Sequence, residues 1–311
     1  MDMRNQLFPD ELLKGFRGHI RFHNNFRDAE DTCAALNTKR AFGETKLAMR
    51  PESFVKLISD HTGASIPDLV FRHSVWPFTA CMRRVAGEAE VEAYIESPYG
   101  RTDLMRKTRQ FAWTCPDCQR EDMDFWGETF WRCSHQLPGQ VWCHKHGTAL
   151  EKTSLGHIDV GPPDHFDSYI PDDIDAEELK THRKLTEYSS LCAAILEGGL
   201  TFSASVCAGS ILRRAEKIGL GKDRKGCVNR ILQLVPLVYP KVWLADLDRR
   251  YPDIQAGQKG GASSFLEGKR ELAGAQMVML LALVVFDTAS EALAELRRTD
   301  KSDESEAEPC I

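Results

Sequence analysis

Apolar residues recur at the spacing of an amphipathic helix in several stretches of this chain. In residues 10–27, Leu12, Phe16 and Ile20 lie four positions apart, and acidic residues open the stretch. Residues 264–298 are apolar through their middle, which predicts a core helix or helix pair that closes a C-terminal domain. The segment that precedes them is also mostly helical in pattern. The predicted fold is therefore mainly α.

Residues 53–74 predict two short helices around a turn. Phe54, Leu57 and Ile58 mark the first helix, and Gly63 suits the positive φ that often follows a helix. This order of elements is that of a helix-turn-helix, and also that of any helical hairpin. The second helix offers few cationic side chains for reading bases, so a protein-binding or structural hairpin is at least as consistent with the pattern.

A second helix, glycine turn and helix lie further along the chain. Residues 208–218 and 227–235 carry apolar residues at helical spacing, and Pro236 is expected to stop the second helix. Cationic residues gather around the turn, which is what phosphate contacts require, although a solvated charged face gives the same pattern. The candidate residues for binding nucleic acid or a partner are Arg213, Arg214, Lys217, Lys222, Arg224, Lys225 and Arg230.

The middle of the chain predicts a small β-hairpin. Residues 130–132, Phe-Trp-Arg, predict one strand, and residues 141–143, Val-Trp-Cys, predict the returning strand. Pro138 and Gly139 between them suit the central positions of a type II turn.

Two ligand pairs frame this predicted hairpin. Cys-Pro-Asp-Cys is followed by 24 residues and then by Cys-His-Lys-His, so two residues separate the members of each pair. That spacing lets a tight turn direct both side chains at one ion, and three thiolates with one imidazole suit a closed, tetrahedral zinc site. The predicted ligands of one structural Zn²⁺ per chain are Cys115, Cys118, Cys143 and His146. Cys133 and His135, on the first predicted strand, are reserve ligands.

Composition places these elements in a chain of 311 residues with 42% hydrophobic residues, which is ordinary for a globular protein of two or three domains. The net charge of -6 hides a basic segment at 201–250, with ten Lys and Arg against four Asp and Glu, and an acidic stretch at 164–178.

The expected domains are an N-terminal helical domain (1–110), a zinc-finger module (111–153), a linker rich in Gly, Pro and Asp (154–180), a C-terminal helical domain (181–299) and an acidic tail (300–311).

The ten cysteines are expected to be reduced thiols. Residues 1–15 lack the apolar stretch of a signal peptide, and the longest apolar run, residues 277–286, is too short to span a bilayer. A cytoplasmic chain without membrane segments would not carry a disulfide framework. The expected small buried cysteines outside the ligand pairs are Cys33, Cys81, Cys192, Cys207 and Cys227.

No group of residues predicts an active site. The stretch 257–261 lacks the terminal Gly-Lys-Ser/Thr of a phosphate-binding loop. Asp246, Asp248 and Asp253 come closest to a nuclease-like triad, but a boundary between a helix and a loop explains them better. The chain is therefore predicted not to be an enzyme.

The region around the ligand pairs resembles the TniQ/TnsD family of bacterial transposon target-selection proteins. The resemblance rests on Cys-Pro-Asp-Cys at 115–118, Phe-Trp-Arg at 130–132, His-Gln-Leu-Pro-Gly at 135–139 and Cys-His-Lys-His at 143–146, which occur together and in order. The opening Phe-Pro-Asp-Glu-Leu-Leu is similar to that of the family. The resemblance covers the first 150 residues well and the remainder loosely.

The resemblance implies an adaptor rather than a transposase. Family members select the insertion site and recruit an AAA+ ATPase of the TnsC or TniB type; some bind attachment-site DNA, and others dock as dimers onto an RNA-guided Cascade complex in CRISPR-associated transposons. It also implies a bacterial cytoplasmic protein, associated with the nucleoid during transposition. This chain is shorter than the site-specific TnsD proteins, which weakens the case for extensive DNA reading. The alternative is a stand-alone, zinc-containing, sequence-specific DNA-binding regulator.

Overall fold

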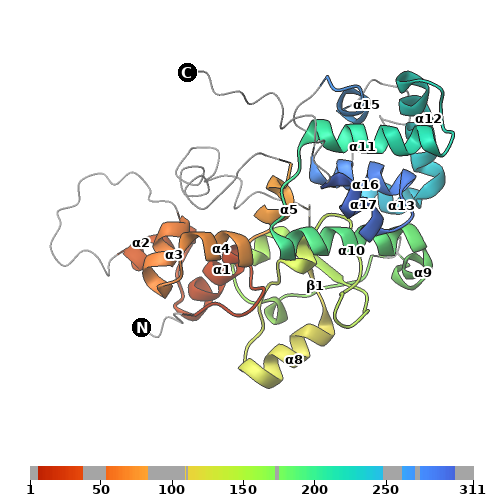
Figure 1. Ribbon diagram of the computed structural model, residues 1–311. Coiled ribbons are helices and arrows are strands. Elements are labelled where there is room, and N and C mark those ends of the chain that lie inside the picture. The colour runs from red at the N-terminus through yellow and green to blue at the C-terminus, as the bar shows by residue number, and fades with distance from the viewer. Residues whose placement is uncertain are drawn as a thin grey trace, which may run out of the picture. The chain divides into compact units, whose positions relative to one another are not determined.

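The structure is a computed structural model that divides into two compact units, each described here by itself (Figure 1). The N-terminal unit comprises residues 1–77 and 85–177, and the C-terminal unit comprises residues 78–84 and 178–311. The residues that the structure describes are 6–37, 54–82, 109, 111–171, 175–247, 261–269 and 274–297. Helices dominate both units, as predicted. The predicted acidic tail, Cys310, Asp248 and Asp253 lie outside the described residues.

Short helices open the N-terminal unit. They are α1 (Leu13–His23), α2 (Ala29–Asn37), α3 (Phe54–Thr62), α4 (Ile66–Arg72) and α5 (Trp76–Ala80), whose last residues belong to the C-terminal unit. Helix α1 lies within the predicted stretch and buries Leu13, Phe16 and Ile20 along one face, as their spacing predicts.

The helical hairpin predicted at 53–74 is confirmed as α3 and α4. Gly63 follows α3 with φ of 75°, and its backbone N–H donates to the Ser59 carbonyl. Ser65 caps α4, because its hydroxyl accepts a hydrogen bond of 3.2 Å from the backbone N–H of Asp68. Helix α3 therefore ends at a glycine that allows the positive φ, and helix α4 begins at a serine that can cap it.

The two-stranded sheet forms from segments other than the predicted ones. Strand β1 (Phe111–Thr114) pairs antiparallel with β2 (Glu151–Ser154), with Phe111 opposite Ser154. The prediction of strands at 130–132 and 141–143 was wrong. Residues 131–133 instead bond to the chain before α1, since the Leu12 N–H donates to the Trp131 carbonyl at 2.7 Å and the Cys133 N–H donates to the Asp10 carbonyl at 2.8 Å. Helix α8 (Pro116–Trp126) and the 3₁₀ helix η2 (Ser134–Gln136) complete the region.

Residues 154–171, predicted as part of a linker, pack into the N-terminal unit. They form the 3₁₀ helices η3 (Leu155–Asp159) and η4 (Pro163–His165), and Ile158 is 2% exposed. Backbone contact with α1 is so close that a Cβ on Gly18 would lie 2.2 Å from the Ile158 carbonyl oxygen. The glycines, prolines and aspartates of this segment form tight turns around the buried Ile158, and they do not form an extended linker.

The C-terminal unit is a set of helices around the apolar helix α16. Its helices are α9 (Ala176–Thr181), which begins just before the division between the units, α10 (Arg183–Gly198), α11 (Ala204–Lys217), α12 (Arg224–Val238), α13 (Lys241–Leu247), α15 (Gly261–Leu266), α16 (Ala275–Val285) and α17 (Ala289–Leu296). Helix α16 contacts α10, α11, α12 and α17, which confirms the predicted core helix within 264–298. Among the described residues no single helix is long and apolar enough to cross a membrane. Helices α16 and α17 have the required length and apolar composition only when they are taken together, and the pair is bent by 114°.

Helix α12 runs through Pro236, where the sequence predicted a stop. The helix continues to Val238, and the Tyr239 N–H donates to the Val235 carbonyl at 3.0 Å. Proline removes one backbone donor, and near a helix end this loss concerns a single bond. Val235 and Tyr239 are both buried, so packing on both sides of the proline holds the last turn in place.

Candidate metal centre

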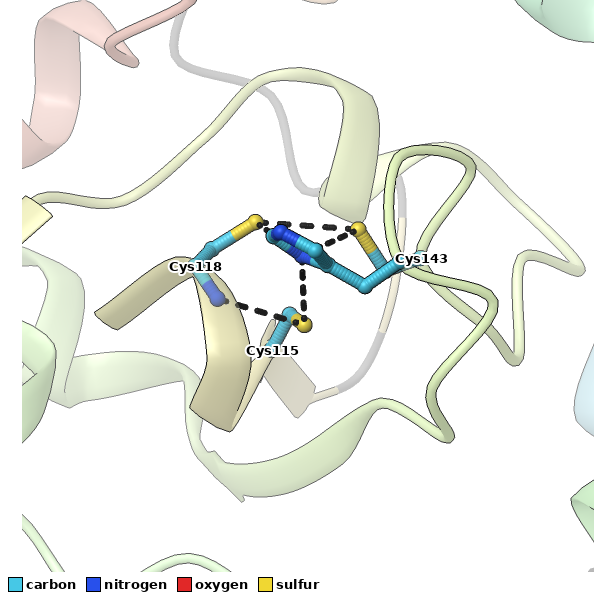
Figure 2. A group of neighbouring side chains, drawn as sticks. Cys115, Cys118 and Cys143 are labelled. Carbon is cyan, nitrogen blue, oxygen red and sulfur yellow. Dashed lines mark hydrogen bonds between the residues drawn. The ribbon is translucent and has the colours of Figure 1, made fainter. Parts of the chain in front are cut away.

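The first ligand pair lies at the start of helix α8, directly after strand β1. Cys115 is the N-cap of the helix, and its sulfur accepts a contact of 3.5 Å from the backbone N–H of Cys118. Pro116 occupies the first helical position, where no backbone donor is needed. A helix N-terminus favours negative charge, so this arrangement suits thiolates. Figure 2 draws this pair beside Cys143, with a dashed line between the Cys118 and Cys143 sulfurs.

The second pair lies on a tight turn opposite α8. The Gly147 N–H donates to the Cys143 carbonyl at 2.7 Å, and the Cys143 N–H donates to the Thr148 carbonyl at 2.8 Å. These bonds fold residues 143–148 back on themselves and bring the His146 ring beside the Cys143 sulfur. The turn, rather than a hairpin strand, therefore presents this pair.

The structure brings the four predicted ligand atoms together at distances that suit one ion. Metal–sulfur bonds of about 2.3 Å and metal–nitrogen bonds of about 2.0 Å place tetrahedral sulfurs about 3.8 Å apart and sulfur and nitrogen about 3.5 Å apart. The Cys118 and Cys143 sulfurs are 3.6 Å apart. His146 Nδ1 lies 3.6 Å from the Cys115 sulfur, 3.4 Å from that of Cys118 and 3.7 Å from that of Cys143. The cluster has the dimensions of a tetrahedral metal site.

The electrostatics of the cluster favour a bound cation. Hydrogen bonds from the Cys115 and Cys118 thiols lower the pKa of Cys143, whereas hydrogen bonding to Cys115 and Cys143 raises the pKa of Cys118. A divalent cation bound by the three sulfurs would replace their protons and stabilise all three thiolates together.

Glu121, one helical turn after Cys118, supports the imidazole from the outer side. Its Oε1 lies 2.9 Å from His146 Nε2, and its other oxygen pairs with Lys145. The ion pair with Lys145 and the contact with His146 lower the pKa of Glu121. A carboxylate on the far nitrogen of a histidine fixes the ring orientation and leaves Nδ1 directed at the metal. The sequence reading missed this role, although the spacing of Glu121 from Cys118 on one helix could have indicated it.

Neither reserve ligand belongs to the group of four. Burial raises the pKa of the Cys133 thiol well above its usual range. His135 is buried with Nε2 3.7 Å from the Cys118 sulfur, so it contacts the edge of the cluster. A ring nitrogen at this distance can donate to a thiolate without binding the metal.

The segment between the ligand pairs also anchors the start of the chain. The Asp10 carboxylate accepts hydrogen bonds from the Ser134 N–H at 3.2 Å and from the Ser134 hydroxyl at 2.5 Å. Arg132 pairs with Asp122 of α8. The contacts between Asp10 and Ser134 join residues 124 positions apart, so no local pattern predicts them.

The structure divides the seven candidate cations of the C-terminal unit into two groups. Arg214 donates to the Val285 carbonyl at 3.2 Å and pairs with Glu291 at 3.0 Å. Arg224 donates twice to the Leu266 carbonyl, at 3.2 and 2.8 Å. These two guanidinium groups support the packing of their own unit.

The other five cations are exposed along α11, α12 and the turn between them. Arg213 donates to the Ser210 hydroxyl at 3.0 Å, and Arg230 donates to Gln233 at 3.4 Å. Lys217, Lys222 and Lys225 extend from the last turn of α11, the loop and the first turn of α12. We call these three the lysine patch.

The N-terminal part of the chain matches a known protein-family model. The model of the family described as TniQ matches residues 3–150, a stretch that ends just beyond the second ligand pair. No curated protein matches the chain.

Proposed function

We propose an adaptor function from the premise that this chain belongs to the TniQ family of transposition-associated proteins through residues 3–150. In this proposal the protein links a target recogniser to an AAA+ ATPase of the TnsC or TniB type. The recogniser is attachment-site DNA or an RNA-guided Cascade complex, and two copies of the chain act together.

The observation that carries the proposal is the way in which the ligand cluster organises the N-terminal unit. Four protein ligands complete a tetrahedron, which leaves no position for a reacting water. Zinc, the ion that suits this ligand set, would supply folding energy at this site. Asp10 and Arg132 connect the cluster region to the chain before α1 and to α8. A rigid surface of this kind suits protein recognition better than catalysis, in keeping with the non-catalytic character of the family.

The lysine patch supports a nucleic-acid contact by the C-terminal unit. Lys217, Lys222 and Lys225 are exposed around one turn between two helices. Ammonium groups on such a surface contact phosphates irrespective of base sequence. The patch would therefore hold DNA or a guide RNA complex, while the N-terminal unit recruits the ATPase.

The test is a pull-down of the full chain with the AAA+ ATPase and any Cascade components encoded beside its gene, with and without DNA and ATP. Capture of the ATPase, lost on chelation of the metal, supports the adaptor. A matched variant, Cys133→Ala, leaves the four ligands in place and should keep the capture. Failure of the native chain to bind the ATPase under every condition would refute the proposal.

The stand-alone regulator is the second candidate, and the lysine patch on a helix–turn–helix arrangement favours it. It requires tight binding to one DNA sequence without an ATPase partner. Selection from a random DNA library would recover a shared sequence if this candidate is correct. Recovery of unrelated sequences with equal affinity would exclude it.

A further inference from the structure

A second group of metal-binding side chains lies in the N-terminal unit, away from the cysteine cluster. Two histidines four residues apart on α1, His19 and His23, face Glu128, which follows α8. His19 Nε2 lies 3.1 Å from Glu128 Oε2, and His23 Nε2 lies 4.0 Å from the same oxygen. One ligand atom from each of the three residues lies within 4.8 Å of the others.

The packing of helix α1 against η3 fixes the position of the two histidines. The close contact of Gly18 with the Ile158 carbonyl leaves no room for the helix to shift towards η3. Residues four apart lie on the same face of a helix, and the two imidazole rings are 4.2 Å apart between centroids. The His19 side chain is 7% exposed and that of His23 is 45% exposed, so the pair runs from the interior to the surface.

Glu128 is held equally firmly on the opposite side. Gly127 ends α8 in the left-handed conformation, with φ of 75°, and turns the chain back towards α1. Thr129 donates to the Asp164 carboxylate, and the Trp131 indole donates to the Gly161 carbonyl at 2.8 Å. The backbone on both sides of Glu128 is therefore held in place.

We propose that His19, His23 and Glu128 bind a second transition-metal ion, with Zn²⁺ as the metal that fits best. Two imidazoles and a carboxylate form a ligand set that zinc uses in proteins, and three protein ligands leave one position for water. Ligand atoms about 2.0 Å from a tetrahedral ion lie about 3.3 Å from one another. The contact of 3.1 Å between His19 Nε2 and Glu128 Oε2 is close to this length, and His23 Nε2, at 4.0 Å from the same oxygen, would have to move closer to bind the same ion.

The site would join two segments that are far apart in the chain. Helix α1 contributes two ligands, and the residue after the C-terminus of α8 contributes the third, while the N-terminus of α8 carries Cys115 and Cys118. One ion would then hold each end of α8. The second ion sits at the surface and exchanges with solvent, unlike an ion enclosed by four protein ligands.

Titration of the full chain with Co²⁺, while the cysteine cluster keeps its own metal, tests the proposal. We expect one further equivalent to bind, with the weak d–d absorption of cobalt held by nitrogen and oxygen and without sulfur-to-cobalt charge transfer. His23→Ala and Glu128→Gln should each weaken this binding by about tenfold or more. His165→Ala, which removes an exposed imidazole outside the group of three, is the matched control and should bind as the native chain does.

Two results would overturn the proposal. In the first, the native chain binds no further equivalent, and the three residues form an ion-paired cluster only. In the second, the added cobalt shows charge-transfer bands or binds His23→Ala unchanged, so it is held elsewhere. His23 is half exposed, so its replacement by alanine leaves the fold intact; circular dichroism checks this even if Glu128→Gln fails to fold.

Discussion

Two helices of equal length show how differently the two units are held together. Helix α8 of the N-terminal unit and α16 of the C-terminal unit each have 11 residues. In α8 the buried residues are Cys118 and Asp122, a candidate metal ligand and the partner of Arg132. In α16 eight residues are buried and all are apolar. The first helix is held by directional bonds and the second by removal of apolar surface from water.

This difference predicts separate sensitivities. Helix α8 leaves Met123, Phe125 and Trp126 exposed, so burial contributes little to its position. Loss of the metal should release α8 without affecting α16. Loss of apolar contacts around α16 should do the reverse.

Cys118→Ser should have the largest effect, confined to the N-terminal unit. We expect the loss of about one metal ion per chain, because a structural zinc site contributes about 10–16 kcal/mol of binding free energy in zinc-finger peptides. That is comparable with the whole stability of a domain, about 5–15 kcal/mol. Elemental analysis gives the metal content, and hydrogen exchange should show α8 unprotected while α16 stays protected.

The control is Cys133→Ala, which removes a buried thiol outside the group of four. It should keep the metal. Loss of the metal in this variant, or full retention in Cys118→Ser, would show that the ligand set is misassigned.

Leu281→Ala in α16 should have the next largest effect, in the other unit. Leu281 is fully buried, so truncation costs about 2–5 kcal/mol through lost burial and the cavity left behind. Hydrogen exchange should rise throughout the C-terminal unit, and the metal content should not change. Leu237, on α12, is 77% exposed, and Leu237→Ala should leave stability within about 0.5 kcal/mol. Metal loss in Leu281→Ala would mean that the two units do not fold independently.

The same substitution should change stability in opposite directions in the two units. Gly18→Ala places a Cβ 2.2 Å from a backbone oxygen that cannot move easily, and should destabilise the N-terminal unit by about 1–3 kcal/mol. The added Cβ of Gly209→Ala in α11 meets only the end of the exposed Arg213 side chain, at 3.2 Å. It should stabilise the C-terminal unit by about 0.5–1 kcal/mol, the usual gain within a helix. Urea unfolding of both variants measures the two signs, and equal signs would contradict the packing described here.

The sequence correctly predicted those features that depend on residues close together in the chain. The two cysteine-containing pairs, the α3–α4 hairpin with Gly63 and the apolar helix in 264–298 all depend on neighbours within a few positions. The pairing of β1 with β2 joins residues about 40 positions apart, with the whole metal region between them. Strand propensity in 130–132 was real, but these residues bond to the chain before α1 instead. Propensity indicates that a segment is extended and does not identify its partner.

The cations of α11 and α12 illustrate the same limit within one unit. Arg214 and Lys217 look alike in the sequence, as do Arg224 and Lys225. Only the fold brings the Val285 carbonyl to Arg214 and the Leu266 carbonyl to Arg224. The basic pattern therefore could not separate the cations that bond to carbonyls of their own unit from those that only extend from its surface.

Replacing the lysine patch should have the smallest effect on stability and a specific effect on binding. Lys217, Lys222 and Lys225 are exposed, so their change to alanine should leave the unfolding midpoint near that of the native chain. If all three contact phosphates, the slope of log K against log salt for DNA binding should fall by about 2.7, since each neutralised phosphate contributes about 0.9. Arg214→Ala is the matched contrast: it removes the partner of Glu291 and should lower stability with less change in slope. An unchanged slope in the triple variant would exclude the patch as a DNA contact and leave protein recognition as the role of this surface.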